Sequence, residues 1–511
     1  MSQPRPQRPY FPIIYVRGYA GTEAAVEETV ATPYMGLNLG STKVRQDWRG
    51  RPVKYIFESP LIRLMKDFGY RDVYYDGSAL PTGQRIAPRS VVVYRYYDQA
   101  SSAFDDAGER AEIEVYAQGL SDLILRVRDH VCGDDDEARS AFGVYLVAHS
   151  MGGLICRCFL QNDDVGSDEA RRMVDKVFTY ATPHNGIDLA VIGNTPGFFT
   201  SNNADNFNRK RMAAYLKLPR SPKRVDDLND RFDADRFFCL VGTDHRDYDA
   251  GAGWSRRLVG PMSDGLVRIA NATVRGAPRA FVRRSHSGDF GIVNSEEGYQ
   301  NLVRFLFGDV RVDGTLIVND LTLPPKVQRA VDQGKRIRAS YHFETILRAR
   351  GARYDLHRRT VDEGSAVFRT FDQMFNPQRA GLAAPRHPHL FSQFLSLKHR
   401  TKRGRGSLVF SVDLMVRVPE YEIDGFLFFD DHIEGSYLFR DTITVAAVPP
   451  DDEHETWRIR YGFDSKTPGR TTKEAESEQR AGGQVFKIPL RSTTRPGLDA
   501  VLELTTQPWN R

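Results

Sequence analysis

The feature that most constrains this chain is a short apolar run followed by small residues and then by a second apolar segment. The run Val144–Val147 is typical of a buried strand, and Leu154–Leu160 continues with helical spacing. Between them the chain reads Ala-His-Ser-Met-Gly-Gly, with Ser150 as its third residue. This order predicts a strand, a sharp turn and a helix, with Ser150 at the apex. A serine hydroxyl is a good nucleophile only when it is held exposed beside a base, so Ser150 is the candidate nucleophile.

The residues on either side of Ser150 are small, as such a turn requires when neighbouring segments pass close to it. Ala148 lies two residues before the serine, Gly152 lies two residues after it, and Gly153 extends the stretch. The pattern is that of the nucleophile elbow, G-x-S-x-G, with alanine at the first position. Alone, the same pattern also occurs in ordinary loops. The buried strand before it and the apolar helix after it favour the elbow.

Short apolar runs alternate with amphipathic stretches over residues 12–310, which is typical of β-α-β units and a mainly parallel sheet. One helix is well marked, because apolar residues recur at spacings of three and four over Ile113–Val131. We therefore predict an α/β catalytic domain over residues 1–310, with helices on both faces of the sheet. The predicted strands are Pro12–Val16, Val91–Tyr97, Val144–Val147, Val177–Ala181, Phe237–Val241 and Ala280–Val282.

The spacing of apolar residues changes after Gly308. Apolar residues alternate with period two over Ile337–Phe343 and again over Phe410–Val418, and helical periodicity is scarce. We predict an antiparallel β-sandwich over residues 311–511 as an accessory domain. Further strands are expected at Tyr437–Val448, Trp457–Tyr461, Val485–Leu490 and Val501–Leu504.

A long excursion separates two predicted strands in the first domain. It covers about residues 187–230 and carries Phe198 and Phe199 in a glycine- and asparagine-rich setting. Excursions of this length inside a compact domain are usually functional. We predict a lid insertion, with a plain surface insertion as the alternative.

The base is expected at the C-terminal edge of the sheet, where ligands bind in open α/β folds. His286 follows the late apolar segment Arg279–Arg284 and so lies at that edge. His184 and His245 also end predicted strands and compete for the role. His149 is adjacent to the nucleophile on the turn, so its side chain should point elsewhere. His286 is our candidate because it comes last in the order nucleophile, acid, base.

Two aspartates compete for the carboxylate that orients the base. Asp264 lies in the tight turn Ser263–Val267, before an apolar pair. Asp244 directly follows the predicted strand Phe237–Val241, which is the simpler topological place. We prefer Asp264 and keep Asp244 as the alternative, since either could be an ordinary turn aspartate.

A nucleophilic serine of this kind also needs two backbone N–H groups that hold a developing oxyanion. Met151, directly after the nucleophile, supplies one of them. The apolar strand Ile13–Val16 runs into a turn at Gly18, and Tyr19 after that glycine is our candidate for the second. The alternative interpretation of this segment is an ordinary β-turn.

Together these segments resemble those of bacterial α/β-hydrolase lipases, and they are similar also to the related acylhydrolases that remove acyl chains from GPI anchors. The resemblance implies an α/β-hydrolase fold in which Ser150 is the nucleophile, Asp264 the acid and His286 the base. It covers about residues 10–308, and Arg17 stands where a histidine is usual. The matching segments are Ile14–Gly21, Ala148–Gly153, Ala181–Gly186, Ser263–Val267 and Ser285–His286.

The activity that this resemblance implies is hydrolysis of a carboxylic ester, in first place a lipid acyl ester, through an acyl-enzyme and without a cofactor. A phospholipase A-type or GPI-type acylhydrolase, or an acyltransferase, would use the same three residues with a different head group or acceptor. The alternative from another class is a non-catalytic binding protein on a hydrolase scaffold. The complete set of serine, aspartate and histidine argues against it.

Composition excludes several other classes. The net charge of +5 arises from 71 basic and 66 acidic residues without a clustered basic stripe, so we predict no nucleic-acid partner. Four cysteines are too few and too badly spaced for a disulfide framework. The first residues are polar and no apolar run is long enough to span a bilayer. We therefore expect no transmembrane segment and a cytoplasmic location, with export by a signal-independent route as the alternative.

Two charged stretches remain. The basic run Lys398–Arg405 is typical of a solvated loop, and a peripheral contact with an anionic lipid surface is the functional alternative. Asp430–His432 and Glu434 are residue types that ligate metals, but no matching spacing accompanies them, so we predict no metal. Nothing in the sequence indicates an oligomeric state.

Overall fold

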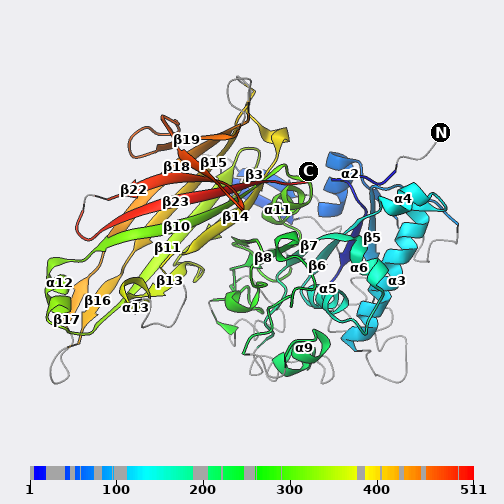
Figure 1. Cartoon of the computed structure of the whole chain (residues 1–511), viewed down its shortest axis with the longest axis horizontal. Helices are drawn as coiled ribbons and strands as arrows, with labels where there is room; N and C mark the ends of the chain where they lie inside the picture. The colour runs from blue at the N-terminus through cyan, green and yellow to red at the C-terminus, as the bar shows by residue number, and fades with distance from the viewer. Residues whose placement is uncertain are drawn as a thin grey trace. The chain divides into compact units, whose positions relative to one another are not determined.

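The chain separates into two compact units, Met1–Phe307 and Gly308–Arg511. Figure 1 shows the whole chain coloured from its N-terminus to its C-terminus. Of residues 41–46 and 52–57 only the backbone is described. The structure is a computed structural model, and it describes residues 5–18, 41–46, 52–57, 59–73, 83–94, 96, 112–187, 205–219, 223–246, 259–260, 262–288, 291–376, 386–402, 406–424, 431–450, 456–492 and 494–510.

The N-terminal unit is built on one seven-stranded sheet in which the strand pairings are parallel. The strand order is β4-β5-β1-β6-β7-β8-β9, so β6 is central and β9 lies at an edge. Every residue of β7 and β8 is buried, as expected for strands that are covered on both faces. The strands are β1 (Ile13–Val16), β4 (Arg71–Asp72), β5 (Ser90–Tyr94), β6 (Val144–His149), β7 (Val174–Tyr180), β8 (Phe237–Gly242) and β9 (Arg279–Val282); β2 (Ser41–Gln46) and β3 (Pro52–Phe57) form a separate antiparallel pair.

Helices cover both faces of this sheet (Figure 1). On one face, Ile14 and Leu146 belong to the same core cluster as the buried sides of α3 and α5. On the other face, the Phe178 ring stacks on Phe238 with centroids 5.0 Å apart, and both rings contact Phe305 of α11. The predicted α/β architecture is confirmed. No helix among the described residues is long and apolar enough to cross a bilayer. The helices are α2 (Pro60–Phe68), α3 (Ile113–Cys132), α4 (Asp136–Ser140), α5 (Met151–Gln161), α6 (Asp168–Met173), α9 (Arg209–Tyr215) and α11 (Glu296–Phe307).

The excursion predicted as a lid is described only in its second half. There α9 and the segment after it pack into the core, with Met212, Leu216 and Val225 fully buried. Buried Arg157 of α5 anchors this half by donating hydrogen bonds to the Val225 and Asp227 carbonyl oxygens at 2.8 and 2.7 Å. The apolar tip with Phe198 and Phe199 lies outside the described residues, so the lid stays a prediction.

The C-terminal unit consists of two antiparallel sheets around one core. One has the order β14-β10-β23-β22-β21, and the other has the path β17-β16-β11-β15-β18-β19-β20 with β12 and β13 paired to β11. The predicted antiparallel β-sandwich is confirmed. Its elements are β10 (Val310–Thr322), α12 (Pro325–Asp332), β11 (Ile337–Ala349), β12 (His357–Arg359), β13 (Val367–Thr370), α13 (Phe371–Phe375), β14 (His389–Leu395), β15 (Leu408–Arg417), β16 (Glu420–Ile423), β17 (Asp431–Glu434), β18 (Tyr437–Val448), β19 (Arg458–Phe463), β20 (Lys473–Glu474), β21 (Glu476–Arg480), β22 (Gly483–Arg491) and β23 (Gly497–Pro508).

The period-two pattern of this unit has a simple cause. Along β15, buried residues alternate strictly with half-buried ones, because successive side chains of a strand point to opposite faces. Phe410 and Val412 of β15 share one core cluster with Phe486 and Ile488 of β22, which belongs to the other sheet. The alternating apolar residues of both sheets therefore meet in the middle of the sandwich.

A lysine lies buried in the N-terminal unit on β7. Lys176 is only 4% exposed, and its ammonium donates hydrogen bonds to the carbonyl oxygens of Leu306 at 3.0 Å and Phe305 at 3.4 Å. Burial lowers the pKa of Lys176 from its ordinary 10.5 to about 7. The side chain therefore releases its proton near neutral pH in the folded chain, whereas it keeps that proton to a much higher pH when the chain unfolds.

This difference predicts a pH-dependent stability. Between about pH 7 and 10.5 the unfolded chain binds a proton that folded Lys176 lacks, so wild type should gain stability relative to Lys176→Met as pH rises. The slope should be at most about 1.4 kcal/mol per pH unit, and the difference should be flat below pH 7. Denaturant unfolding of both proteins from pH 6.5 to 9.5 measures it. Lys335→Met removes an exposed lysine and should show no such slope; an equally flat result for Lys176→Met would contradict the assignment.

Candidate active site

Ser150 occupies a strained turn between β6 and α5. Its backbone has φ 51° and ψ −123°, a conformation that costs a residue with a side chain about 1–3 kcal/mol. Three hydrogen bonds hold it there. The Ser150 N–H donates to the Tyr180 carbonyl oxygen at 2.9 Å, and the Ser150 carbonyl oxygen accepts from the Gly153 N–H at 3.1 Å and the Thr182 hydroxyl at 2.9 Å. Tyr180, Gly153 and Thr182 therefore hold the backbone of Ser150 in this conformation.

Two glycines make room for this turn. A Cβ on Gly152 would lie 2.3 Å from the Val16 carbonyl oxygen and 2.6 Å from that of Arg17, both of which are backbone atoms. A Cβ on Gly18 would lie 2.8 Å from the His149 ring and 3.0 Å from the Ser150 Cβ. The close approach of neighbouring segments expected from the small residues is therefore a property of the structure, and β1 is the segment that approaches.

His286 and Asp264 meet at Ser150. The Nε2 atom of His286 lies 3.0 Å from the Ser150 Oγ, and its Nδ1 lies 2.9 Å from Asp264 Oδ2. A carboxylate only accepts hydrogen bonds, so Nδ1 carries the proton in neutral His286 and Nε2 is free to accept from the serine hydroxyl. The side chains are nearly enclosed, with residue exposures of 7% for Ser150, 2% for His286 and 1% for Asp264.

The turn around Asp264 fixes the direction of its carboxylate. Oδ1 accepts from the backbone N–H groups of Leu266 at 3.0 Å and Val267 at 2.7 Å. The His286 N–H also donates to the Asp264 carbonyl oxygen at 2.9 Å. The acid and the histidine are thus joined through both side chains and backbone.

The competing residues form other contacts. Asp244 accepts from the Arg246 N–H at 3.0 Å and lies 3.8 Å from the Arg283 guanidinium. His184 is fully buried, with Nε2 3.1 Å from the Thr179 hydroxyl. His245 is half-buried directly after β8. The structure therefore brings Asp264, and not Asp244, to His286.

His149, which the sequence analysis set aside, contacts His286. Its Nε2 lies 2.9 Å from the His286 carbonyl oxygen, and the two ring centroids are 5.0 Å apart. A carbonyl can only accept, so Nε2 of His149 is the donor. Although part of its surface is accessible, burial and then the neighbouring His286 lower the pKa of His149 to about 3, which keeps the ring neutral. Its Nε2 holds the backbone of His286.

The predicted oxyanion donors are described only in part. Met151 is the first residue of α5, and among the described residues no acceptor lies in hydrogen-bond range of its N–H. A free N–H at a helix start can bind an oxyanion. Tyr19 lies outside the described residues, which end at Gly18 in this segment, so its role stays a prediction.

Side chains that could share a metal ion gather at one place within the described ranges. They are Glu420, Glu422 and His432 on β16 and β17 of the C-terminal unit. His432 is among the residues considered from the sequence; the two glutamates are not. Glu420 and His432 are exposed and Glu422 is half-buried, which is the usual setting of strand side chains that face water.

The N-terminal unit has an α/β-hydrolase fold. Its parallel sheet carries the elbow after the central strand β6, the aspartate after β8 and the histidine after β9. A scan against protein-family models gives no match, and none of the curated proteins matches the sequence.

Solved structures with a similar backbone trace include two bacterial enzymes. The chain is 14% identical to the Bacillus licheniformis lipase BlEst2, with a TM-score of 0.32 over 60% of this chain and 94% of that one. It is 13% identical to the phospholipase PlaB from Legionella pneumophila, with a TM-score of 0.31 over 91% of this chain and all of the other.

The packing at Gly152 predicts that even one methyl group is harmful there. Alanine usually stabilises a helix by about 1 kcal/mol relative to glycine, but the added Cβ of Gly152→Ala would press on the β1 carbonyls. We expect a net loss of about 1–3 kcal/mol in unfolding free energy, measured by denaturant titration. Gly482→Ala is the control, because the nearest atom to a Cβ there is 4.0 Å away. Equal stability of the two variants would show that the β1 contact is not tight.

Proposed function

We propose that this chain is a serine hydrolase that cleaves carboxylic esters, with a lipid acyl ester as its substrate. The observation that carries the proposal is a pair of hydrogen bonds, one between Ser150 and His286 and one between His286 and Asp264. Ser150 lies in a strained turn, and all three side chains are nearly enclosed. Strain of this kind persists where the surrounding structure enforces it, and it is concentrated at functional sites. The lipid part of the proposal rests on the motif resemblance.

In the proposed mechanism, His286 Nε2 takes the hydroxyl proton as the Ser150 oxygen attacks the acyl carbon. Asp264 orients the imidazole and stabilises its charged form. The Met151 N–H, with the Tyr19 N–H as second donor, holds the oxyanion of the tetrahedral intermediate. His286 returns the proton to the leaving alcohol and then deprotonates a water, which attacks the acyl-enzyme and releases the carboxylic acid.

The alternatives share this constellation. A phospholipase A-type or GPI-type acylhydrolase differs in head group, and an acyltransferase passes the acyl group to an acceptor other than water. A binding protein on the same scaffold would leave the serine unreactive. Labelling by a fluorophosphonate separates catalyst from scaffold. Analysis of the products from short esters, triacylglycerols and phospholipids separates the enzyme alternatives.

The triad predicts a large loss of kcat for a change at each of its three residues. Ser150→Ala and His286→Ala should lower kcat on a short ester by roughly three or more orders of magnitude. Asp264→Asn should lower kcat by roughly two to four orders of magnitude, because an amide can donate to Nδ1 and so favours the wrong tautomer. Steady-state kinetics on folded proteins measures all three.

Asp244→Asn is the matched control, since it makes the same chemical change at the competing aspartate. It should keep kcat within about threefold of wild type, because Asp244 contacts Arg246 and Arg283 and not His286. An inactive Asp244→Asn beside an active Asp264→Asn would overturn the assignment of the acid. Normal fluorophosphonate labelling of Ser150→Ala would overturn the nucleophile.

A further inference from the structure

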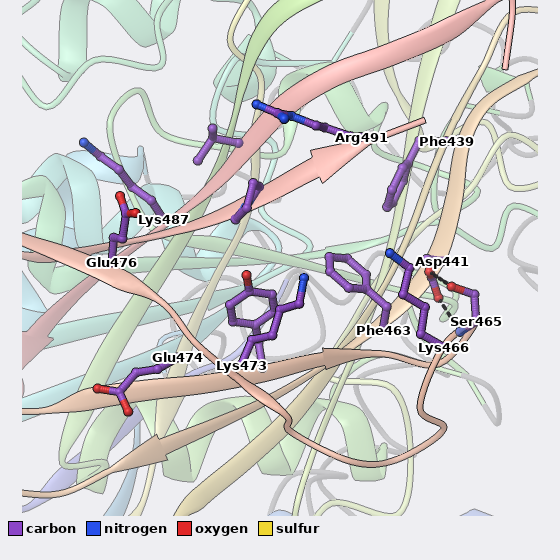
Figure 2. Close-up of a pocket in the computed structure, with 13 residues that line it drawn as sticks. Phe439, Asp441, Phe463, Ser465, Lys466, Lys473, Glu474, Glu476, Lys487 and Arg491 are labelled. Atoms are coloured by element: carbon purple, nitrogen blue, oxygen red, sulfur yellow. Dashed lines mark hydrogen bonds between the residues drawn. The ribbon is translucent and has the colours of Figure 1, made fainter. Parts of the chain in front are cut away.

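The C-terminal unit contains an open pocket of about 610 Å³. Strands of both sheets build it: β18, β19 and β20 from one, and β21, β22 and β23 from the other. Figure 2 shows its side chains. The volume is in the range of sites that take small organic molecules. The lining residues are Phe439, Asp441, Tyr461, Phe463, Ser465, Lys466, Lys473, Glu474, Glu476, Lys487, Pro489, Arg491 and Val501.

Apolar and aromatic side chains form a large part of this lining. Tyr461 and Phe463 are only 4% and 9% exposed, yet both line the pocket, so the surface that they retain opens into it. Their rings lie edge to face with centroids 5.8 Å apart. Figure 2 shows the rings of Phe439 and Phe463 at the same end of the pocket. Such a surface binds the apolar body of a ligand, and a small inorganic ion would gain nothing from it.

Several of the charged lining groups already have partners. The Lys487 ammonium lies 2.7 Å from Glu478, and the Arg491 guanidinium lies 3.3 Å from Asp499. Asp441 accepts hydrogen bonds from the hydroxyl of Ser465 at 2.5 Å and from its N–H at 3.1 Å. Because these groups already interact with other protein side chains, they are less available to a ligand.

Two lysines have no such partner. Lys466 and Lys473 are exposed, and neither forms an ion pair with any residue that the structure describes. Figure 2 shows both side chains reaching into the pocket, whereas Glu474 points out of it and lies 3.8 Å from Arg458. Glu476 and Asp441 are the lining carboxylates without an ion pair among the described residues. Figure 2 shows Glu476 away from the aromatic end and Asp441 at it. At that end the ammonium groups of Lys466 and Lys473 face the single carboxylate of Asp441, so the net charge there is positive.

From this combination we propose that the pocket binds an amphipathic organic anion. A carboxylate or phosphate group lies between Lys466 and Lys473, and an apolar or aromatic body lies against Phe439 and Phe463. A neutral amphiphile would leave both ammonium groups unused, and a cationic one would be repelled by them. The site stands on the C-terminal unit alone and does not depend on the chemistry proposed for Ser150, although an acid released by ester hydrolysis belongs to this ligand class.

The test uses the full chain and four probes with a twelve-carbon chain, which in dodecanoate includes the carboxylate carbon, and each probe is kept below its micellar concentration. Isothermal titration should show binding of dodecanoate or dodecyl phosphate, with dodecyl maltoside and dodecyltrimethylammonium at least about tenfold weaker. The two anions distinguish a free carboxylate from a phosphate as the preferred head group. Lys466→Ala/Lys473→Ala should weaken the better anion about tenfold, as expected for the loss of two solvent-exposed ion contacts.

Three further variants make the result specific. Lys326→Ala/Lys335→Ala removes two exposed lysines from the same unit outside the pocket and should bind like wild type. Lys466→Arg/Lys473→Arg keeps both charges and should retain most of the affinity. Phe439→Ala should weaken the twelve-carbon anion but leave butanoate unchanged. Unfolding midpoints confirm that each variant is folded.

Either of two results would overturn the proposal. One is anion binding that Lys466→Ala/Lys473→Ala leaves unchanged, which would place the anion elsewhere, for instance at Ser150. The other is a failure to select for the anion, seen either as equal binding of neutral, cationic and anionic probes or as binding of none of them. Activity of the Ser150 site enters neither readout, so failure of this proposal and failure of the proposed hydrolase function can be told apart.

Discussion

The site in the N-terminal unit depends first on how the backbone of Ser150 is held in its strained conformation. A cost of about 1–3 kcal/mol is matched by three hydrogen bonds, each of which contributes about 1 kcal/mol. Two of them come from Tyr180 and Thr182, at the end of β7. The neighbouring strand therefore positions the nucleophile as much as β6 does, although the sequence motif lies entirely on β6 and α5. The approach of β1 to Gly152 closes the turn from the other side.

The elbow could be predicted from sequence because its determinants are local. An apolar strand, small residues and an apolar helix lie within about seventeen residues, and each follows from spacing and side-chain size. The acid could not be assigned by position, since Asp244 and Asp264 both follow β8. What separates them is the turn that gives Asp264 two backbone donors and aims it at His286. The contact of His149 with His286 was not predicted, because its partner there is a carbonyl oxygen, which no side-chain pattern reveals.

The fold was predictable to a similar degree and for the same reason. Strands whose pattern repeats within one segment, such as β15, were found from period two alone. β10 and β14 were not predicted. Gly314 interrupts the apolar face of β10 that carries Val312 and Leu316, and Gln393 interrupts the face of β14 that carries Phe391 and Leu395. The pocket of the C-terminal unit was invisible for a different reason. Its lining comes from six strands, and only the pairing of distant segments brings them together.

Asp264 and His286 are hydrogen-bonded through both backbone and side chains, and the segment of chain between them contains β9, the outermost strand of the sheet. Edge strands are the parts of a sheet that fray first, whereas a central strand such as β6 opens only when the whole domain does. Partial melting would therefore displace His286 before it displaced Ser150. Loss of the proposed activity on gentle heating would then precede global unfolding, and it would be reversible as long as the centre of the sheet stayed intact.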